Sequence, residues 1–371
     1  MSDSKILNHI LFFLIIFIVT GTLLNIHLIA LYYKKFKPSP ESIFLPDYND
    51  SNYTHWSKIP IKCDKIDIVY TWVNGSDKFH ILSRYFKKGG DLNTILKDNP
   101  RYRDLMGLKY SLRSVKKYVP FINNIWIITD NQYPNWINLN SLGNIHFITH
   151  QQLFKNRSHL PSFNSNAIES NFHSLPDEVS DCFLYLNDDI FFGNYVNYSD
   201  FFDDDYGIAV YPEKWKAPVL KPEGVWHKSI AFSNSILNRQ WEEDKERYYP
   251  THGLQVWNKN ILKRMYREIR NEIEFTSQNR FRTNNDTQIP FLFQQYALKY
   301  YRHFLPPPIN FYGSINDDIK KTREIYFNIT RYHPKTVCLN DRLSDVTPDQ
   351  IYQDLYKFFN TMFPDKGDFE L

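Results

Sequence analysis

The sequence predicts an α/β protein with a Rossmann-like, mostly parallel sheet that has helices on both faces, together with an N-terminal transmembrane helix. Short apolar runs rich in β-branched and aromatic residues recur along the chain, and turn-forming residues bound each one. Segments between these runs repeat apolar residues at spacings of three and four, as amphipathic helices do. Strands that alternate with helices favour a parallel sheet, because each helix can carry the chain back to the start of the next strand.

Four runs have the composition of buried strands, and they span 66–73, 124–130, 144–150 and 182–192. A helix is predicted over 104–119, where apolar residues form one face before Pro120 ends it. Helical spacing returns at 258–273 and 291–301. The last predicted helix begins at Thr347-Pro348-Asp349-Gln350, which has the pattern of an N-cap, a proline at the first helical position and a capping glutamine.

One segment, 10–31, has no charged residue over about the length that a bilayer core requires. It favours an uncleaved signal anchor over a buried core helix. No small-x-small site follows it, as a cleaved signal peptide would require. The predicted organisation is a cytoplasmic tail at 1–9, a transmembrane anchor at 10–33, a polar stem at 34–64 and one folded domain at 65–371.

The charge balance excludes nucleic acid as a partner. The 371 residues include 44 basic and 41 acidic side chains, for a net charge of +3, and no basic run is present. Orientation signals around the anchor disagree: Lys34, Lys35 and Lys37 follow it, which favours a cytoplasmic location for the rest of the chain. Seven Asn-x-Ser/Thr sequons favour a secretory lumen instead. They begin at Asn49, Asn52, Asn74, Asn156, Asn197, Asn285 and Asn328.

The three cysteines are too few for a disulfide scaffold. Cys182 lies inside an apolar strand pattern and is predicted to be a buried thiol. The sequence leaves open whether Cys63 and Cys338 form a disulfide.

Polar residues close the predicted strands, at the edge where ligands bind in parallel α/β sheets. Asp188 and Asp189 follow an apolar strand, and two adjacent carboxylates can hold a divalent cation that neutralises a diphosphate. A solvated turn is the alternative, because Asn-Asp-Asp is ordinary turn composition. Asn74, Gly75 and Asp77 close the first strand, either as a plain turn or as a loop that presents backbone N–H groups to a phosphate.

Four blocks of sequence occur in order. The first is IDIVYTWVNGSD (66–77). The second runs from RYRD (101–104) through LKYSLRSVKKYVPFINNIWIITDNQYPNWI (108–137), ITHQQLF (148–154) and HLPSFNSNAIES (159–170) to YLNDDIFFG (185–193). The third joins HGLQVWNKNIL (252–262) to RFRTNNDTQIPFL (280–292), and the fourth is KTVCLND (335–341). Together they resemble the Stealth family, which includes bacterial capsular polysaccharide phosphotransferases and the lysosomal-enzyme N-acetylglucosamine-1-phosphotransferase.

The resemblance implies a UDP-sugar-dependent transferase that moves a sugar 1-phosphate onto a hydroxyl of a glycan or glycoprotein and releases UMP. N-acetylglucosamine 1-phosphate is the first expectation for the transferred group. The resemblance also implies a divalent metal, Mg²⁺ or Mn²⁺, and a single-pass type II protein of the Golgi or another secretory membrane, with its catalytic domain in the lumen. A metal-dependent glycosyltransferase that releases UDP, and a scaffold without activity, are the alternatives. The sugar, the acceptor and the oligomeric state, including a homo-oligomer, stay open.

The resemblance assigns roles to individual residues. His252, Arg282, Asp188 and Asp189 are expected to be catalytic, with Arg282 on the phosphoryl oxygens. His252 is expected to be the general base, a role that suits histidine because the unperturbed imidazole titrates near neutral pH, and a covalent phosphohistidine is the variant. The expected substrate-binding residues are Trp72, Asn74, Gly75, Asp77, Arg103 and Asn187. The expected metal ligands are Asp188, Asp189 and Asp286. Long insertions of the animal lysosomal enzyme are absent between the second and third blocks, so the resemblance does not extend to its protein acceptors.

Overall fold

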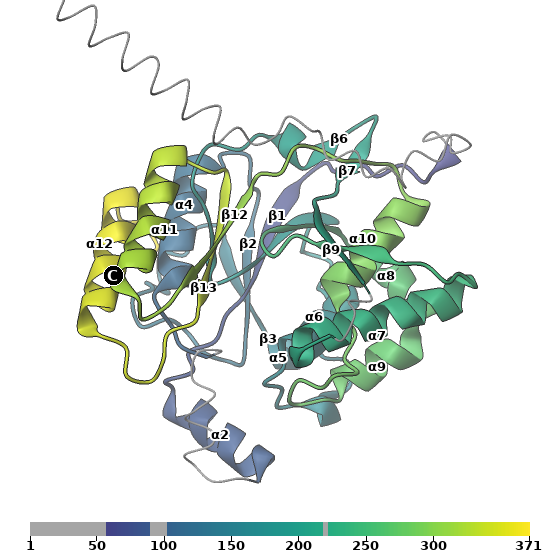
Figure 1. Ribbon diagram of the computed structural model, residues 1–371, viewed down its shortest axis with the longest axis horizontal. Helices are drawn as coiled ribbons and strands as arrows, with labels where there is room; N and C mark the ends of the chain where they lie inside the picture. Colours follow the sequence, from purple (N-terminus) through teal and green to yellow (C-terminus); the bar gives the residue numbers. More distant parts are fainter. Residues whose placement is uncertain (1–56, 90–101, 218–221) are drawn as a thin grey trace, which may run out of the picture. The chain divides into compact units, whose positions relative to one another are not determined.

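The computed structural model describes residues 57–89, 102–217 and 222–371 (Figure 1). The predicted cytoplasmic tail, the predicted anchor at 10–33 and most of the predicted stem lie outside these residues. Within the described ranges, no helix combines the length and the apolar character needed to cross a membrane.

The fold is built on one mixed sheet whose strands lie in the order β10-β4-β1-β2-β3. Three of its four pairings, β4–β1, β1–β2 and β2–β3, are parallel, and only β10 runs antiparallel to its neighbour β4. The prediction of a mostly parallel sheet is therefore confirmed. The strands are β1 (Ile66–Thr71), β2 (Ile125–Thr129), β3 (Ile145–Thr149), β4 (Cys182–Asn187) and β10 (Gln255–Asn258).

Helices cover both faces of this sheet, as the sequence predicts (Figure 1). Side chains of a strand alternate between the two faces, and hydrogen bonds tie each face to a different helix. On one face, the Tyr70 hydroxyl of β1 lies 2.7 Å from the Ser111 hydroxyl of α4 (Gly107–Tyr118). On the other, the Tyr185 hydroxyl of β4 lies 3.0 Å from a carboxylate oxygen of Glu169 in α6 (Ser165–Ser170). Strands buried on both faces are usually continuous apolar runs. β2 follows this pattern up to Thr129, whereas β1 is interrupted by the buried Asp67.

The strand order creates a switch point between β1 and β4. From β1 the chain proceeds through β2 to β3, and β4 then pairs on the other side of β1. The connections that leave the carboxyl ends of β1 and β4 therefore diverge. Ligands of open α/β sheets bind at such points.

Smaller sheets and further helices surround the central sheet. The three smaller sheets have the orders β12-β13-β5, β11-β7-β6 and β8-β9. Their strands are β5 (Ile190–Phe192), β6 (Phe202–Asp203), β7 (Gly207–Ala209), β8 (Pro212–Ala217), β9 (Arg247–Pro250), β11 (His303–Phe304), β12 (Asn310–Ile315) and β13 (Thr336–Asp341). The other helices within the described ranges are α2 (Lys78–Lys88), α5 (His150–Leu153), α7 (Gly224–Trp241), α8 (Lys259–Glu268), α9 (Arg270–Ser277), α10 (Ile289–Tyr300), α11 (Ile319–Tyr332) and α12 (Asp349–Met362). Short 3₁₀ turns lie at η4 (Arg157–His159), η5 (Phe172–Ser174) and η6 (Tyr198–Asp200).

Two predicted elements are divided in the structure. The run 182–192, predicted as one strand, is β4 and β5, and β5 pairs with β13 in a different sheet. Asp188 and Asp189 form the turn between them. The predicted helix at 258–273 is α8 and α9, which meet at Ile269, where the backbone leaves the helical region (φ −126°, ψ 42°).

The last helix begins with different capping from the predicted pattern. α12 starts at Asp349, Pro348 precedes its first residue, and no side chain caps it. Thr347, the predicted N-cap, donates its hydroxyl instead to Asp317 at 2.6 Å. Gln350 donates to Asp354 within the helix rather than back to the cap.

The predicted stem ends earlier than residue 64. The described residues from 57 onward form one compact unit, and Lys58 is buried where its ammonium group donates to the carbonyl of Leu298. The backbone of Ile59 exchanges hydrogen bonds with Tyr300 and Arg302 at 3.0 and 2.9 Å. Chain from residue 57 onward is therefore part of the folded domain.

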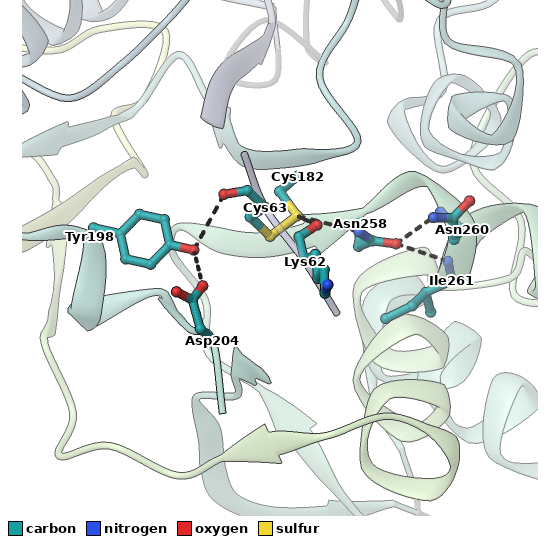
Figure 2. The surroundings of a disulfide bond; sticks show 8 residues. All are labelled: Lys62, Cys63, Cys182, Tyr198, Asp204, Asn258, Asn260 and Ile261. Atoms are coloured by element: carbon teal, nitrogen blue, oxygen red, sulfur yellow. Dashed lines mark hydrogen bonds between the residues drawn. A yellow bond between two sulfur atoms is a disulfide. The ribbon is translucent and has the colours of Figure 1, made fainter. Parts of the chain in front are cut away.

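The cysteine predictions need correction. Cys63 pairs with Cys182, and the disulfide joins the segment before β1 to the first residue of β4 (Figure 2). The adjacent pairing of Ile66 with Cys182 in the sheet brings the two cysteines together. Cys182 is therefore not a thiol, and Cys338 is the free, buried cysteine of the described residues. Asn258, the N-cap of α8, donates to the Cys182 sulfur at 3.3 Å.

Candidate active site

The acidic pair Asp188–Asp189 lies at the switch point, directly after β4. Both side chains are half-buried in the turn that leads to β5. The N-terminus of α4 packs closely against this turn, and a Cβ atom at Gly107 would overlap the carbonyl oxygen of Asp188. Glycine at 107 therefore permits the helix to begin beside the two carboxylates, with its positive end toward them.

Four carboxylates share this region: Asp188, Asp189, Asp104 and Asp341. Burial, together with the negative charges of Asp189 and Asp104, raises the pKa of Asp188 well above its ordinary range. Burial likewise raises the pKa of Asp104 and of Asp341. For Asp341, the positive charge of Arg103 opposes the shift, and the negative charges of Asp317 and Asp189 add to it. Mutual repulsion of this kind is relieved when a cation binds, so the site favours a positively charged ligand.

Asp189 connects the acidic pair to His252 through a cysteine. The Cys338 thiol lies 3.6 Å from Asp189 Oδ2 and its sulfur lies 3.5 Å from His252 Nδ1. Burial raises the pKa of Asp189, while the His252 charge opposes this effect. Within the described residues, the buried Oδ1 of Asp189 has no hydrogen-bond partner of ordinary geometry. An unpartnered buried carboxylate oxygen is costly, and a bound cation would satisfy it.

Aromatic rings and a backbone contact hold His252 in place. Its ring meets Tyr312 and Trp226 edge-on, at centroid distances of 5.1 and 5.8 Å. Its carbonyl accepts a hydrogen bond from the Asn310 amide at 3.1 Å. The imidazole therefore has a defined orientation beside β12 and β13.

A second network reaches from Asn187 to Arg282. Asn187 Oδ1 accepts from the Thr71 hydroxyl at 2.9 Å and lies 2.8 Å from the Tyr185 hydroxyl, which also contacts Glu169. Burial raises the pKa of Glu169 to about 7, and the positive charge of Arg282 is among the groups that oppose the shift. Arg282 itself is exposed and donates to the Ser165 hydroxyl at 2.6 Å. A carboxyl group with a pKa near neutrality is typical of functional sites.

The loop after β1 forms the other side of the switch point. Gln132 holds this loop in position: its side chain accepts from the backbone N–H of Asn74 at 2.9 Å and donates to the Asn74 carbonyl at 3.0 Å. Gly75 donates its N–H to the Tyr102 carbonyl at 2.8 Å, and a Cβ atom would overlap that carbonyl. Trp72 is buried next to Asp104. These three predicted residues therefore line or support the site.

Two predicted substrate-binding residues, Arg103 and Asp77, form ion pairs or hydrogen bonds with other groups of the protein. Arg103 forms an ion pair with Asp341 at 3.3 Å and also donates to the Ser344 carbonyl at 3.2 Å. It thus ties the loop before α4 to the end of β13. Asp77 is the N-cap of α2 and accepts from the His80 N–H at 2.8 Å. The structure gives Asp77 a role in starting this helix.

The structure surrounds Asp286, a predicted metal ligand, with donors from the protein itself. The carboxylate is fully buried and accepts five hydrogen bonds between 2.8 and 3.3 Å, so no lone pair remains for a cation. The donors are the side-chain amides of Asn164, Asn166 and Asn279, and the backbone N–H and hydroxyl of Thr283. Across the described ranges, no three His, Cys, Asp or Glu side chains converge tightly enough to hold a metal by themselves.

Sequence reasoning missed four residues that the structure brings to this region. They are Asp104, Glu169, Cys338 and Asp341. Each lies inside one of the four blocks quoted above, so a signal was present. The roles of Cys338 and Asp341 could not be predicted, because their partners Asp189 and Arg103 come from distant parts of the chain.

The fold and this geometry define a class: a mixed α/β protein with an acid-rich polar site at the carboxyl ends of a mostly parallel sheet. Four family regions match the chain, described as Stealth protein conserved regions 1 to 4, at residues 64–84, 101–210, 251–299 and 328–371. The chain belongs to the Stealth family. The fourth region extends well beyond the block 335–341 and includes α12.

Curated relatives of the chain are named as capsular polysaccharide phosphotransferases. The chain is 30% identical to the fcs1 protein of Haemophilus influenzae over 308 residues, which cover 80% of this chain and 82% of that protein. It is 27% identical to WcwK of Streptococcus pneumoniae over 349 residues, 83% of this chain and 98% of that protein. SacB of Neisseria meningitidis serogroup A is 28% identical over 331 residues, and the match spans 86% of this chain but 60% of SacB.

Proposed function

We propose that this protein transfers a sugar 1-phosphate from a UDP-sugar to a glycan hydroxyl and releases UMP. The names of its relatives support a phosphotransferase acting on a polysaccharide. The observation that carries the proposal is the pair of contact chains that meet at the switch point. One joins Asp189 to His252 through Cys338, and the other leads from Asn187 through Tyr185 and Glu169 to Arg282.

The residues at the turn after β4 fit a divalent cation. Asp188 and Asp189 would hold it, because Asp189 Oδ1 lacks a partner and the charge repulsion on Asp188 is unrelieved. Mg²⁺ commonly takes one or two protein carboxylates and completes its shell with water and substrate phosphates, so a third protein ligand is not needed. A bound cation would neutralise charge on the donor diphosphate.

His252 is suited to accept the proton of the acceptor hydroxyl. Burial and the Asp189 charge raise the pKa of the Cys338 thiol well above its ordinary range. The thiol therefore stays protonated, and its S–H donates a hydrogen bond to Asp189 Oδ2. The sulfur can then accept from Nδ1–H of His252. This arrangement leaves Nε2 with a free lone pair, which is the form that a general base requires.

Arg282 would provide positive charge at the far end of the network that starts at Asn187. Its planar guanidinium can donate to two phosphoryl oxygens at once, and charge on the transferred phosphoryl group grows during the reaction. Its exposed position and its contact with Ser165 place it where a polar substrate can reach it. Thr71 and Tyr185 orient the Asn187 amide oxygen between the two sides.

The test is to identify the nucleotide product. The full chain is incubated with a panel of UDP-sugars, beginning with UDP-N-acetylglucosamine, and a panel of glycans, with Mg²⁺ or Mn²⁺ and with a chelator. Chromatography should show UMP released in step with phosphorylated glycan. Release of UDP would contradict the proposal and would instead indicate a glycosyltransferase.

Matched variants connect the activity to the site. Asp189→Asn removes one charge at constant size, so metal affinity and UMP release should fall together. Asp244→Asn, an exposed aspartate before β9, is the control and should behave as the unmodified chain. His252→Ala should lose transfer to glycan and keep donor binding, measured by calorimetry. Normal UMP release from His252→Ala in the presence of acceptor would remove the base role from this histidine.

A further inference from the structure

Helix α2 exposes an apolar stripe that the proposed function does not use. Phe79, Leu82 and Phe86 are 83%, 48% and 73% exposed. They are separated by three and four positions, so they lie in one row along the helix. Figure 1 shows α2 at the periphery of the fold. Exposed large apolar side chains that form a row, rather than standing singly, indicate a binding surface.

The opposite side of α2 is fixed to the domain. Arg84 is buried with its guanidinium 3.8 Å from the ring centroid of Tyr102, and His80 packs against Tyr102 and Phe163 at 5.5 and 5.3 Å. The apolar stripe therefore points away from the domain because the helix is held by its polar face. This is the reverse of the usual amphipathic packing of a surface helix.

The charged residues beside the apolar stripe indicate what kind of surface it binds. Exposed Lys78 and Lys87 flank it on its two sides at helical spacing, Lys88 follows, and α2 contains no Asp or Glu. A second copy of the same helix would bring like charges together. Three side chains are also few for a stable protein interface, which buries about 800 Å² on each partner. Phenylalanine and leucine on one face with lysines beside them are typical of helices that lie in a membrane interface.

We propose that α2 docks on the surface of an anionic lipid bilayer, with Phe79, Leu82 and Phe86 inserted and the lysines among the headgroups. Insertion of this kind is weak for one short helix, but a chain that is already tethered gains from high effective concentration. The bilayer-length apolar run that the sequence places at 10–31 would supply such a tether.

The test measures the environment of the stripe in the full chain. Leu82→Cys is labelled with a thiol-reactive dye whose emission depends on polarity. The protein is reconstituted into vesicles of phosphatidylcholine and phosphatidylglycerol, whose surface is anionic. The native cysteines are a disulfide and a buried thiol, so background labelling is measured on the unmodified chain. Phe327→Cys, at a phenylalanine that is 58% exposed on α11, is the matched control on an equally tethered protein.

We expect a blue shift and quenching by brominated lipid at position 82, and neither at position 327. Lys78→Glu with Lys87→Glu should reduce the quenching by roughly tenfold or more, because each basic residue near an anionic surface contributes about 1 kcal/mol. Three outcomes would overturn the proposal: a dye at position 82 that stays in water with vesicles present, equal quenching at both positions, or a blue shift without lipid that grows with protein concentration. The last would identify a second copy of the chain as the occupant.

Discussion

Cys338 occupies an unusual place for a free cysteine. It lies between a carboxylate and a histidine that are both assigned to the reaction, and its raised pKa keeps it protonated. A thiolate would be a nucleophile, whereas a protonated thiol is a weak hydrogen-bond donor. Cys338 is therefore a positioning residue for His252 under the proposed function.

Replacing this thiol should affect turnover more than donor binding. Cys338→Ala leaves Nδ1 of His252 without its partner, and we expect kcat to fall roughly tenfold, a part of the 10²–10⁴-fold that a general base contributes. The KM for the UDP-sugar should change little. Cys338→Ser restores a donor and an acceptor and should recover part of the loss. Steady-state kinetics over pH 5–9 distinguishes this role from a merely structural one, since only a positioning role changes the pH profile.

Glu169 should make stability depend on pH. Its pKa is about 7 in the folded protein and near 4.5 when exposed, so the folded state holds a proton that the unfolded state has lost across this window. The contribution of this group to stability is therefore complete below about pH 4.5 and is lost as pH rises toward 7.

Glu169→Gln keeps the shape and removes this titration. The free energy of unfolding by urea should fall from pH 4.5 to pH 8 by roughly 3 kcal/mol more in the unmodified chain than in Glu169→Gln, since one pKa unit corresponds to about 1.4 kcal/mol. The difference between the two proteins isolates this group from the other acidic residues with raised pKa values. Parallel curves for the two proteins would show that Glu169 has an ordinary pKa.

At the scale of elements, the start of α4 and the turn after β4 form one unit. Met106 precedes the helix in a left-handed conformation (φ 63°), and its N–H donates to Asp104 at 2.8 Å. The helix then begins at Gly107, directly against Asp188. The conformation of the acidic turn therefore depends on how closely this helix approaches.

Gly107→Ala should disturb that approach. The added methyl group overlaps the Asp188 carbonyl, which is backbone and cannot rotate away. We expect destabilisation of about 1–3 kcal/mol, the usual range for overpacking, and a larger proportional loss of metal-dependent activity than of folded protein. Thermal unfolding and UMP release measure the two effects. Unchanged activity at unchanged stability would mean that α4 does not constrain the acidic turn.

For the whole molecule, the disulfide joins regions that are far apart in the chain. Cys63 and Cys182 are separated by 119 residues, and the bond secures the edge where β1 and β4 begin. A structural disulfide supports the proposal that the domain works in an oxidising compartment, in agreement with the expectation of a secretory lumen.

Removing the disulfide should lower stability substantially. Closing a loop of this length is associated with about 4–5 kcal/mol of stabilisation on the chain-entropy account. The double variant Cys63→Ser, Cys182→Ser should therefore unfold at a lower urea midpoint than the unmodified chain. Mild reductant should reproduce the shift in the unmodified chain and have no effect on the double variant. Equal midpoints for both proteins would show that the bond is not formed.

Some features follow from local sequence alone. Strands β1 to β4, the helix α4 and the parallel arrangement were predictable, because apolar periodicity and turn residues act over a few positions. The placement of Asp188 and Asp189 at a strand end followed from the same pattern. These predictions depend on neighbours in sequence, and the structure confirms them.

Other features were decided only by contacts between distant segments. The sequence did not pair Cys63 with Cys182, and it did not separate β5 from β4. Asp286 is an acidic residue that could ligate a metal, yet Asn164 and Asn166, more than a hundred residues away at the start of α6, join donors of its own loop in binding its carboxylate. The proposed positioning role of Cys338 depends on its contacts with Asp189 and His252, which are 149 and 86 residues away in the sequence. Local sequence determines which elements form and where they end, whereas the chemistry of a polar side chain depends on the partners that tertiary packing brings to it.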